Sequence, residues 1–160
     1  MEGISLTRIV KPKNISKVLV LHGGVSEEKE VSNSTAKSCI EAIKRIKFDV
    51  DSLSVNSANM HKLAEVVKAK NPDVIFNALH GGFGENGTIQ GLFETIRIPY
   101  THSGVLPSAL AMDKFISKKI FKAHGLPVIE DLLLNIQGPL KGIPVAPPFV
   151  IKPNNGGSSV

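Results

Sequence analysis

A histidine and a glutamate lie five residues apart in a loop that is dense in glycine. The stretch "HGGFGENGTIQG", residues 80–91, contains five glycines and follows the apolar run "VIFNAL". Ordering glycine costs more conformational entropy than ordering any other residue, so such density is typical of a tight turn or a close approach to a ligand. Glu85 could orient the imidazole of His80, and both side chains can carry charge or move protons. We interpret the stretch as a loop that binds a ligand.

Lysines and a second glycine-rich loop could bind phosphate groups. Lys152 ends the apolar run "FVI" and precedes a proline, which is an unfavourable place for an unpaired charge. The loop that follows, residues 156–159, offers flexible backbone amides and two hydroxyls that could close over phosphate oxygens. Lys114 shares a predicted helical face with other lysines, so the residues alone favour a solvated side chain.

A carboxylate stands at the predicted start of the first helix. Glu30 follows the glycine pair at residues 23–24 and precedes a helical pattern. Acidic side chains stabilise the amino termini of helices, so the residues alone favour a structural role for Glu30. The His, Cys and carboxylate residues show no spacing typical of a zinc site.

Short apolar strands alternate with amphipathic helices along the first part of the chain. Strand patterns occur at residues 17–24, 50–55, 73–79 and 98–103, and helical patterns at 31–46, 57–71 and 88–97. This alternation predicts an α/β fold with a parallel sheet and helices on its faces. Ligands of such sheets bind beyond the carboxyl ends of the strands, where both glycine-rich turns fall. The two turns are therefore expected to share one site.

The pattern changes after residue 108. Residues 109–125 predict one helix, residues 126–136 predict a strand, and residues 137–148 form a connector rich in Pro and Gly. Residues 149–160, "FVIKPNNGGSSV", predict a strand that runs into the second glycine loop. We place a domain boundary near residue 110, with a leader at 1–16, an amino-terminal domain at 17–110 and a second segment at 111–160.

Composition argues against several classes of protein. The chain has 160 residues, a net charge of +5 and one cysteine, Cys39, so it forms no internal disulfide, which fits a reducing cytoplasm. Aromatic residues make up 5% with no Trp, which leaves little surface for stacking nucleic-acid bases. No apolar run approaches the length of a membrane span, and the first residues lack the features of a signal peptide. We expect a cytoplasmic protein without membrane or nucleic-acid partners.

Four short stretches, taken together, resemble the amino-terminal half of the D-alanine:D-alanine ligases, members of the ATP-grasp superfamily. They are "HGGVSEEKEVS" (22–32), "LHGGFGENGTIQG" (79–91), "YTHSGVLPSALAMDK" (100–114) and "FVIKPNNGGSSV" (149–160). Each is weak alone, but the four in this order are specific, and the resemblance covers nearly everything from residue 17 to 160. It implies a three-layer, Rossmann-like pre-ATP-grasp domain, followed by the incomplete start of an ATP-grasp domain.

The resemblance implies roles for residues in the first two stretches. The glutamate that matches Glu30 faces the ammonium of the first D-alanine in this family, where it binds by a charge-assisted hydrogen bond. His80 and Glu85 match the wall of the D-alanine site. The family usually has Asp where this chain has Asn86, and often Arg where it has Lys29. Lysine keeps the charge of arginine but loses its bidentate geometry.

The nucleotide site is implied by the last two stretches. Lysines that match Lys114 and Lys152 contact the phosphates of ATP in ATP-grasp enzymes. Serines that match Ser158 and Ser159 close over the site, and the resemblance gives Ser158 a catalytic role beside the Glu30 carboxylate. Magnesium ligands and the adenine pocket of the family come after residue 160, so no metal ligand is expected within this chain.

The implied reaction is ATP-dependent ligation of two D-alanines through an acyl phosphate, which supplies D-alanyl-D-alanine for peptidoglycan, the cell wall and cell shape. The full-length family implies a homodimer, whereas residues 1–160 alone are expected to be inactive. One alternative is a ligase of the same family that makes D-alanyl-D-lactate or uses D-serine. Another is a non-catalytic or vestigial fragment, and a nucleic-acid-binding protein is the least favoured.

Overall fold

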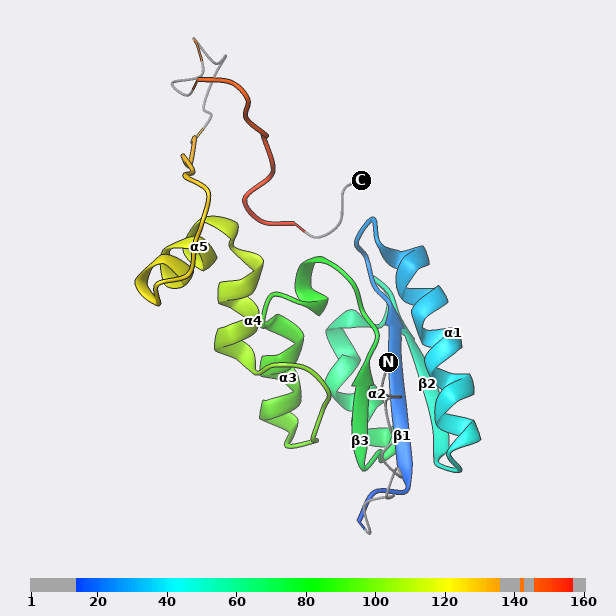
Figure 1. The fold of residues 1–160 in the computed structure, drawn as a ribbon. Helices are drawn as coiled ribbons and strands as arrows, with labels where there is room; N and C mark the ends of the chain where they lie inside the picture. Colours follow the sequence, from blue (N-terminus) through cyan, green and yellow to red (C-terminus); the bar gives the residue numbers. More distant parts are fainter. Residues whose placement is uncertain (1–13, 136–141, 143–145, 157–160) are drawn as a thin grey trace, which may run out of the picture.

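A computed structural model describes residues 14–135, 142 and 146–156. At its centre is a three-stranded parallel sheet with the order β2-β1-β3, in which Val18 pairs with Val50 on one side and with Val74 on the other (Figure 1). In chain order the elements are β1 (Lys17–Gly23), α1 (Lys29–Arg45), β2 (Asp49–Val55), the 3₁₀ turn η1 (Met60–Lys62), α2 (Leu63–Lys70), β3 (Val74–Asn77), the 3₁₀ turn η2 (Gly82–Gly84), α3 (Thr88–Ile96), α4 (Val105–Met112) and α5 (Lys114–Ala123).

The central strand β1 is buried on both faces, and its alternate side chains separate the two halves of the core. Val18 and Val20 pack with α1 on one face. Leu19 and Leu21 pack with α2 and α3 on the other face, where Phe93 is fully buried. Successive side chains of a strand point to opposite faces, so one apolar strand supplies both layers. The result is three layers, with α1 and α3 on opposite sides of the sheet (Figure 1).

The strands and helices predicted between residues 17 and 97 are confirmed, but the fourth strand is not. Residues 98–103 form a single bridge, in which Ile75 donates to the Pro99 carbonyl at 2.8 Å and Thr101 donates to the Ile75 carbonyl at 3.0 Å. The chain then turns away, because the next residue, His102, has a left-handed backbone with φ +94°. Residues 99–101 therefore cover the edge of β3 without extending the sheet as a strand.

The single helix predicted at residues 109–125 is two helices. Asp113 has an extended backbone between α4 and α5, and its carboxylate accepts a hydrogen bond from the backbone N–H of Ile116 at 2.8 Å. An aspartate in this position caps the amino terminus of a helix. The apolar spacing continues across residue 113, so the cap rather than the pattern sets the break. The predicted domain boundary near residue 110 falls within α4 and stays a prediction.

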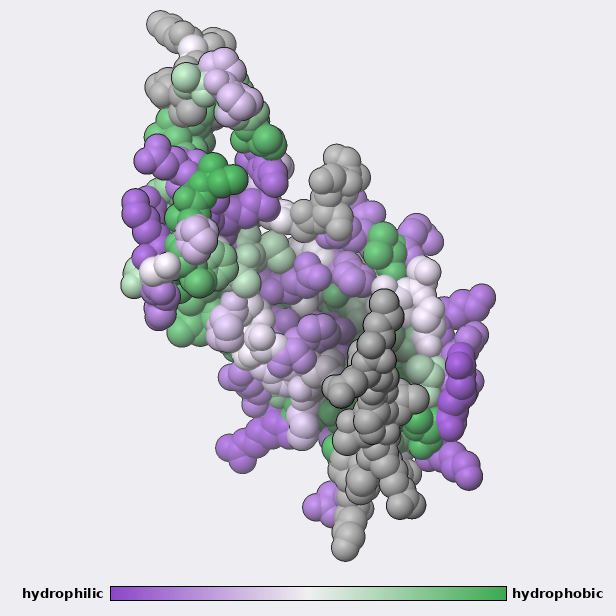
Figure 2. Space-filling view, in the orientation of Figure 1, coloured by the Kyte–Doolittle hydropathy of each residue, from purple (hydrophilic) through white to green (hydrophobic). Residues whose placement is uncertain are grey.

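The strands predicted at residues 126–136 and 149–151 are wrong for the residues that the structure describes in them. Residues 126–135 and 149–151 have no strand pairing, and Ile129 and Val150 are 85% and 78% exposed. A strand needs a neighbour to satisfy its backbone hydrogen bonds, and propensity alone does not supply one. Apolar side chains therefore reach the surface around α5 and the segment after it (Figure 2). No helix in the described ranges is long and apolar enough to cross a membrane.

Candidate functional site

The turn after β1 requires glycine because it passes close to β2. Gly23 has φ +83°, and a Cβ added there would lie 2.9 Å from the Val55 carbonyl oxygen. Gly24 follows with φ +96° and donates its N–H to the same oxygen at 2.8 Å. Left-handed backbone without steric cost is a property of glycine. The chain is thereby directed from the carboxyl end of β1 into the start of α1.

A buried serine fixes the start of α1 against two strand ends. The Ser32 hydroxyl accepts from the Gly23 N–H at 2.9 Å and donates to the Ala78 carbonyl at 2.7 Å. A second hydroxyl, that of Ser26, donates to the His80 carbonyl at 2.7 Å. The loop after β1 and the loop after β3 therefore form one continuous edge, which we call the rim and define as residues 22–35 and 77–90.

Two buried amides hold the glycine loop in shape. Asn77 and Gln90 each donate to the Gly84 carbonyl, at 2.9 and 3.1 Å, and both residues are at most 2% exposed. Asn77 also accepts from the Leu79 N–H at 3.2 Å. Neither amide was predicted from the sequence as part of the site. The signal for Asn77 was a polar residue within the apolar run "VIFNAL", where a buried amide needs partners.

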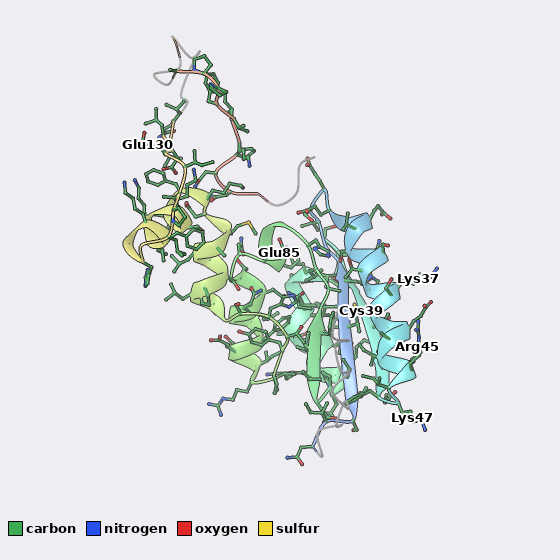
Figure 3. The ribbon with its side chains drawn as sticks, in the orientation of Figure 1. Lys37, Cys39, Arg45, Lys47, Glu85 and Glu130 are labelled. Atoms are coloured by element: carbon green, nitrogen blue, oxygen red, sulfur yellow. The ribbon has the colours of Figure 1, made fainter. Side chains whose placement is uncertain are left out.

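The structure brings His80 and Glu85 together at the top of β3. The His80 Nδ1 lies 3.5 Å from the Glu85 Oε1, and both side chains are about one-third exposed, at 31% and 37%. The other carboxylate oxygen of Glu85 accepts from the Gly81 N–H at 3.0 Å. On the opposite side of the ring, Nε2 lies 3.0 Å from the Thr35 hydroxyl of α1. Figure 3 labels Glu85 in the loop between β3 and α3.

Glu30 lies in the first turn of α1, on the rim, and is exposed. Its carboxylate is thus accessible to a ligand at the strand ends. Asn86, where the family pattern has an aspartate, accepts from the Thr88 N–H at 3.1 Å and so supports the start of α3. An asparagine can make this contact as well as an aspartate.

Lys114 lies against the segment that leads into the second glycine loop. Its ammonium donates to the carbonyl oxygens of Gly156 at 2.8 Å and Asn154 at 3.4 Å. The Asn154 side chain accepts from the Phe115 N–H at 2.9 Å and fixes this segment to the start of α5. Figure 1 shows residues 146–156 at the same end of the molecule as the loop between β3 and α3. The predicted residues Ser158 and Ser159 lie outside the described residues.

The surroundings of Lys152 and of the carboxylates bear on the binding of phosphate groups and metal ions. Lys152 is exposed and follows exposed residues that form no strand, so the unfavourable apolar surroundings expected for its charge are not present. Backbone and side-chain hydrogen bonds, the largest from Ile116, hold the pKa of Asp113 below its ordinary value. Within the described ranges, no three His, Cys, Asp or Glu side chains are grouped closely enough to hold a metal ion.

Comparison with known proteins identifies relatives of the whole arrangement. Residues 52–103 match a family model described as the D-ala D-ala ligase N-terminus. A D-alanine–D-alanine ligase from Jannaschia sp. (strain CCS1) is 50% identical over 148 residues, which are 91% of this chain and 46% of that protein. A D-alanine–D-alanine ligase from Sinorhizobium medicae (strain WSM419) is 47% identical over 142 residues, with 89% and 45% covered.

Solved structures give the same answer for the fold. The D-alanine–D-alanine ligase from Bacillus anthracis matches with a TM-score of 0.60 and 40% identity, over 69% of this chain and 35% of that one. The same protein has been solved in complex with ATP. The chain spans a little less than half the length of the curated relatives that it matches, at 46% and 45%. By sequence and by fold, the chain belongs to the D-alanine–D-alanine ligase family and corresponds to the amino-terminal part of its members.

Proposed function

We propose that this chain forms the D-alanine-binding part of an ATP-dependent D-alanine–D-alanine ligase that acts in the cytoplasm. The observation that carries the proposal is the rim. Hydrogen bonds from Ser26 and Ser32 join its two segments, which carry the exposed Glu30 in the first turn of α1 and the His80–Glu85 pair in the loop after β3. Ligands of parallel α/β sheets bind at this edge.

Glu30 is suited to bind the ammonium group of the first D-alanine. The substrate is a small zwitterion, so most of its binding energy must come from paired charges and oriented hydrogen bonds. A carboxylate that accepts from an ammonium makes a hydrogen bond roughly twice as strong as a neutral one. Because Ser32 fixes the first turn of α1 to both strand ends, Glu30 is presented from a rigid element rather than from a loop.

The nucleotide would bind where Lys114 meets residues 152–156. The Lys114 ammonium and the amides of this loop would neutralise phosphate oxygens, as would Lys152, which is exposed in the same segment. The γ-phosphoryl group would pass to a carboxylate oxygen of the first D-alanine, with ADP as the leaving group. The amine of the second D-alanine would then attack the acyl carbon, and phosphate would leave as the amide bond forms.

The protein's part in this reaction would be to bind, orient and stabilise charge. Positioning two reactants in a fixed geometry and stabilising developing charge account for much of the rate of such enzymes. Magnesium would neutralise the phosphates in the complete ligase. The residues that the structure describes provide no grouped ligands for it.

The proposal is tested by following amide resonances of the chain while D-alanine is added. We expect shifts confined to the rim with D-alanine and much weaker ones with L-alanine. Glu30→Gln should weaken D-alanine binding, whereas Glu27→Gln, an exposed acid just before α1, should not. In a completed ligase, loss of the Glu30 charge should cost roughly 2–5 kcal/mol in kcat/KM.

Each outcome has a clear meaning. Unchanged D-alanine affinity in Glu30→Gln would remove Glu30 from the site while leaving the rim as a candidate. No D-alanine-dependent shift in the wild-type chain would contradict the proposal that these residues bind the substrate.

A further inference from the structure

The imidazole of His80 is held by polar groups on both of its nitrogens. Nδ1 faces the Glu85 carboxylate at 3.5 Å, and Nε2 faces the Thr35 hydroxyl at 3.0 Å. Glu85 is itself fixed by the Gly81 N–H. Thr35 comes from the second turn of α1 and is half-buried, on the helix that also presents Glu30. The ring is therefore held between its own glycine loop and α1. Thr35 and His80 are 45 residues apart in the sequence.

The chemistry of these partners assigns the hydrogens. An ionised carboxylate can only accept hydrogen bonds, so the ring hydrogen of a neutral His80 belongs on Nδ1, facing Glu85. Nε2 is then an acceptor, and the Thr35 hydroxyl must donate to it. In the protonated ring both nitrogens donate, and the Thr35 oxygen accepts after its hydrogen rotates away. A hydroxyl is both donor and acceptor, so it keeps this contact in either charge state.

A second histidine ring is also contacted by a polar side chain of α1. The His22 ring at the end of β1 has its Nδ1 2.9 Å from the side-chain oxygen of Asn33. The first two turns of α1 thus contact the ends of β1 and β3 through the side chains of Ser32, Asn33 and Thr35. Thr35 differs from the other two because its partner His80 begins the glycine loop.

We propose that Thr35 is a positioning residue for the substrate wall, which holds His80 in the Nδ1–H tautomer and in one orientation. His80 lies beyond the last residue of β3, so strand pairing does not restrain its side chain. Without Thr35, the long contact to Glu85 alone would leave the ring free to rotate. Small displacements of groups around a substrate cost much of their effect, because binding and catalysis depend on fixed geometry. The substrate consequence rests on the proposed function, but the tautomer and the hydrogen bond do not.

The experiment measures the ring nitrogens of His80 directly, by ¹⁵N–¹H correlation spectra of the ¹⁵N-histidine-labelled 160-residue chain at mildly alkaline pH. We expect hydrogen on Nδ1 and a chemical shift of Nε2 typical of a hydrogen-bonded acceptor. Thr35→Val, which keeps the shape but removes the hydroxyl, should move Nε2 toward the value of an unbonded acceptor. Thr35→Ser should keep the wild-type shift, and Ser38→Ala, an exposed hydroxyl one turn later on α1, is the matched control.

D-alanine titration of the same samples separates the two parts of the inference. Thr35→Val should bind D-alanine roughly two- to tenfold more weakly, as expected for one lost hydrogen bond, and Thr35→Ser should bind nearly as the wild type does. Hydrogen on Nε2 in the wild type, or an unchanged Nε2 shift in Thr35→Val, would overturn the assignment even if a variant folded poorly. Equal D-alanine affinity in Thr35→Val would overturn the positioning role. Absence of D-alanine binding in the wild type would instead contradict the proposed function and leave the Thr35–His80 bond standing.

Discussion

At the scale of single residues, uncharged side chains build the rim and charged ones occupy it. Ser32 connects the backbone at Gly23 to the backbone at Ala78 while being fully buried. Asn77 and Gln90 do the same for the glycine loop by donating to one carbonyl. Buried donors are usually paired, so each of these side chains has few alternatives, and the buried Gln90 Oε1 accepts no hydrogen bond from the described residues.

Replacing Ser32 by alanine should destabilise the chain by about 1–3 kcal/mol. The change would leave the Gly23 N–H and the Ala78 carbonyl without their partner in a buried place, and an unpaired buried group costs about that much. The measurement is the urea midpoint at unchanged slope, with Ser34→Ala, an exposed serine of the same helix, as the control. Equal midpoints for the two variants would show that water takes over both hydrogen bonds.

The sequence predicts contacts of this kind only when the partners are close along the chain. His80 and Glu85 belong to one short loop, so their spacing alone indicated that they could meet. The partners of Ser32 and Thr35 in the loop after β3 are 46 and 45 residues away along the chain, and no spacing pattern reveals them. Their pairing follows from the register of β1 with β3, which only the folded sheet defines.

At the scale of elements, one aspartate joins the starts of two strands at the edge opposite the rim. Asp73, just before β3, accepts from the backbone N–H groups of Lys17 and Ser16, each at 2.8 Å. The Ser16 hydroxyl donates to the same oxygen at 2.9 Å. These bonds, that of Lys17 first, lower the pKa of Asp73 below its ordinary value.

The chain should therefore lose stability in acid, in part through Asp73. Because its pKa is lower in the folded state than in the unfolded state, the contribution is present above the ordinary Asp value of about 3.9. It is lost as the pH falls through the lower, folded value. Urea midpoints measured from neutral to acid pH should fall less steeply for Asp73→Asn than for the wild type. Asp49→Asn, on the exposed start of β2, should retain the wild-type slope; parallel curves for Asp73→Asn would contradict the prediction.

Elements were predictable from periodicity where both the pattern and the partners are local. The helices and strands up to residue 97 follow the apolar spacing closely. The break at Asp113 was not predicted, because the apolar spacing continues through it. A single side-chain cap starts the new helix there. Residues 126–135 have the propensity of a strand but no partner among the described residues, and pairing decides whether a strand forms.

At the scale of the whole molecule, the buried apolar core ends before α4. Its buried apolar members run from Val18 to Phe93, whereas none of the described apolar side chains after residue 104 is buried and many of them are exposed. Figure 2 shows the apolar surface around α5 and the segment that follows. Exposed apolar groups and unpaired backbone favour local opening.

Limited proteolysis should cut first after about residue 110 and leave a resistant amino-terminal core. The sheet and its three covering helices supply that core, while the later segment has few buried groups to hold it closed. Mass spectrometry of the early fragments at low protein concentration identifies the cut. Equal resistance of the two parts in a monomer would show that the second segment is as stable as the first.

Residues 1–160 assayed alone should release no phosphate in response to D-alanine. The curated relatives are about twice as long, and the described residues group no ligands for a metal ion. A full-length relative, assayed in parallel, controls for substrate and detection. Turnover that survives removal of host ligase and disappears in Glu30→Gln would contradict this prediction.

The glycines of the rim are required for different physical reasons, which matters when such motifs are used to search genomes. Gly23 and Gly84 have no space for a side chain, since an added Cβ would lie 2.9 Å from the Val55 carbonyl oxygen and 2.6 Å from the Leu79 Cβ. An added Cβ at Gly82 meets no described atom within 4 Å, but its φ of +47° lies in the left-handed region, so the backbone conformation alone favours glycine there. The first two glycines thus report the fold and would persist in a homologue that had changed its ligand.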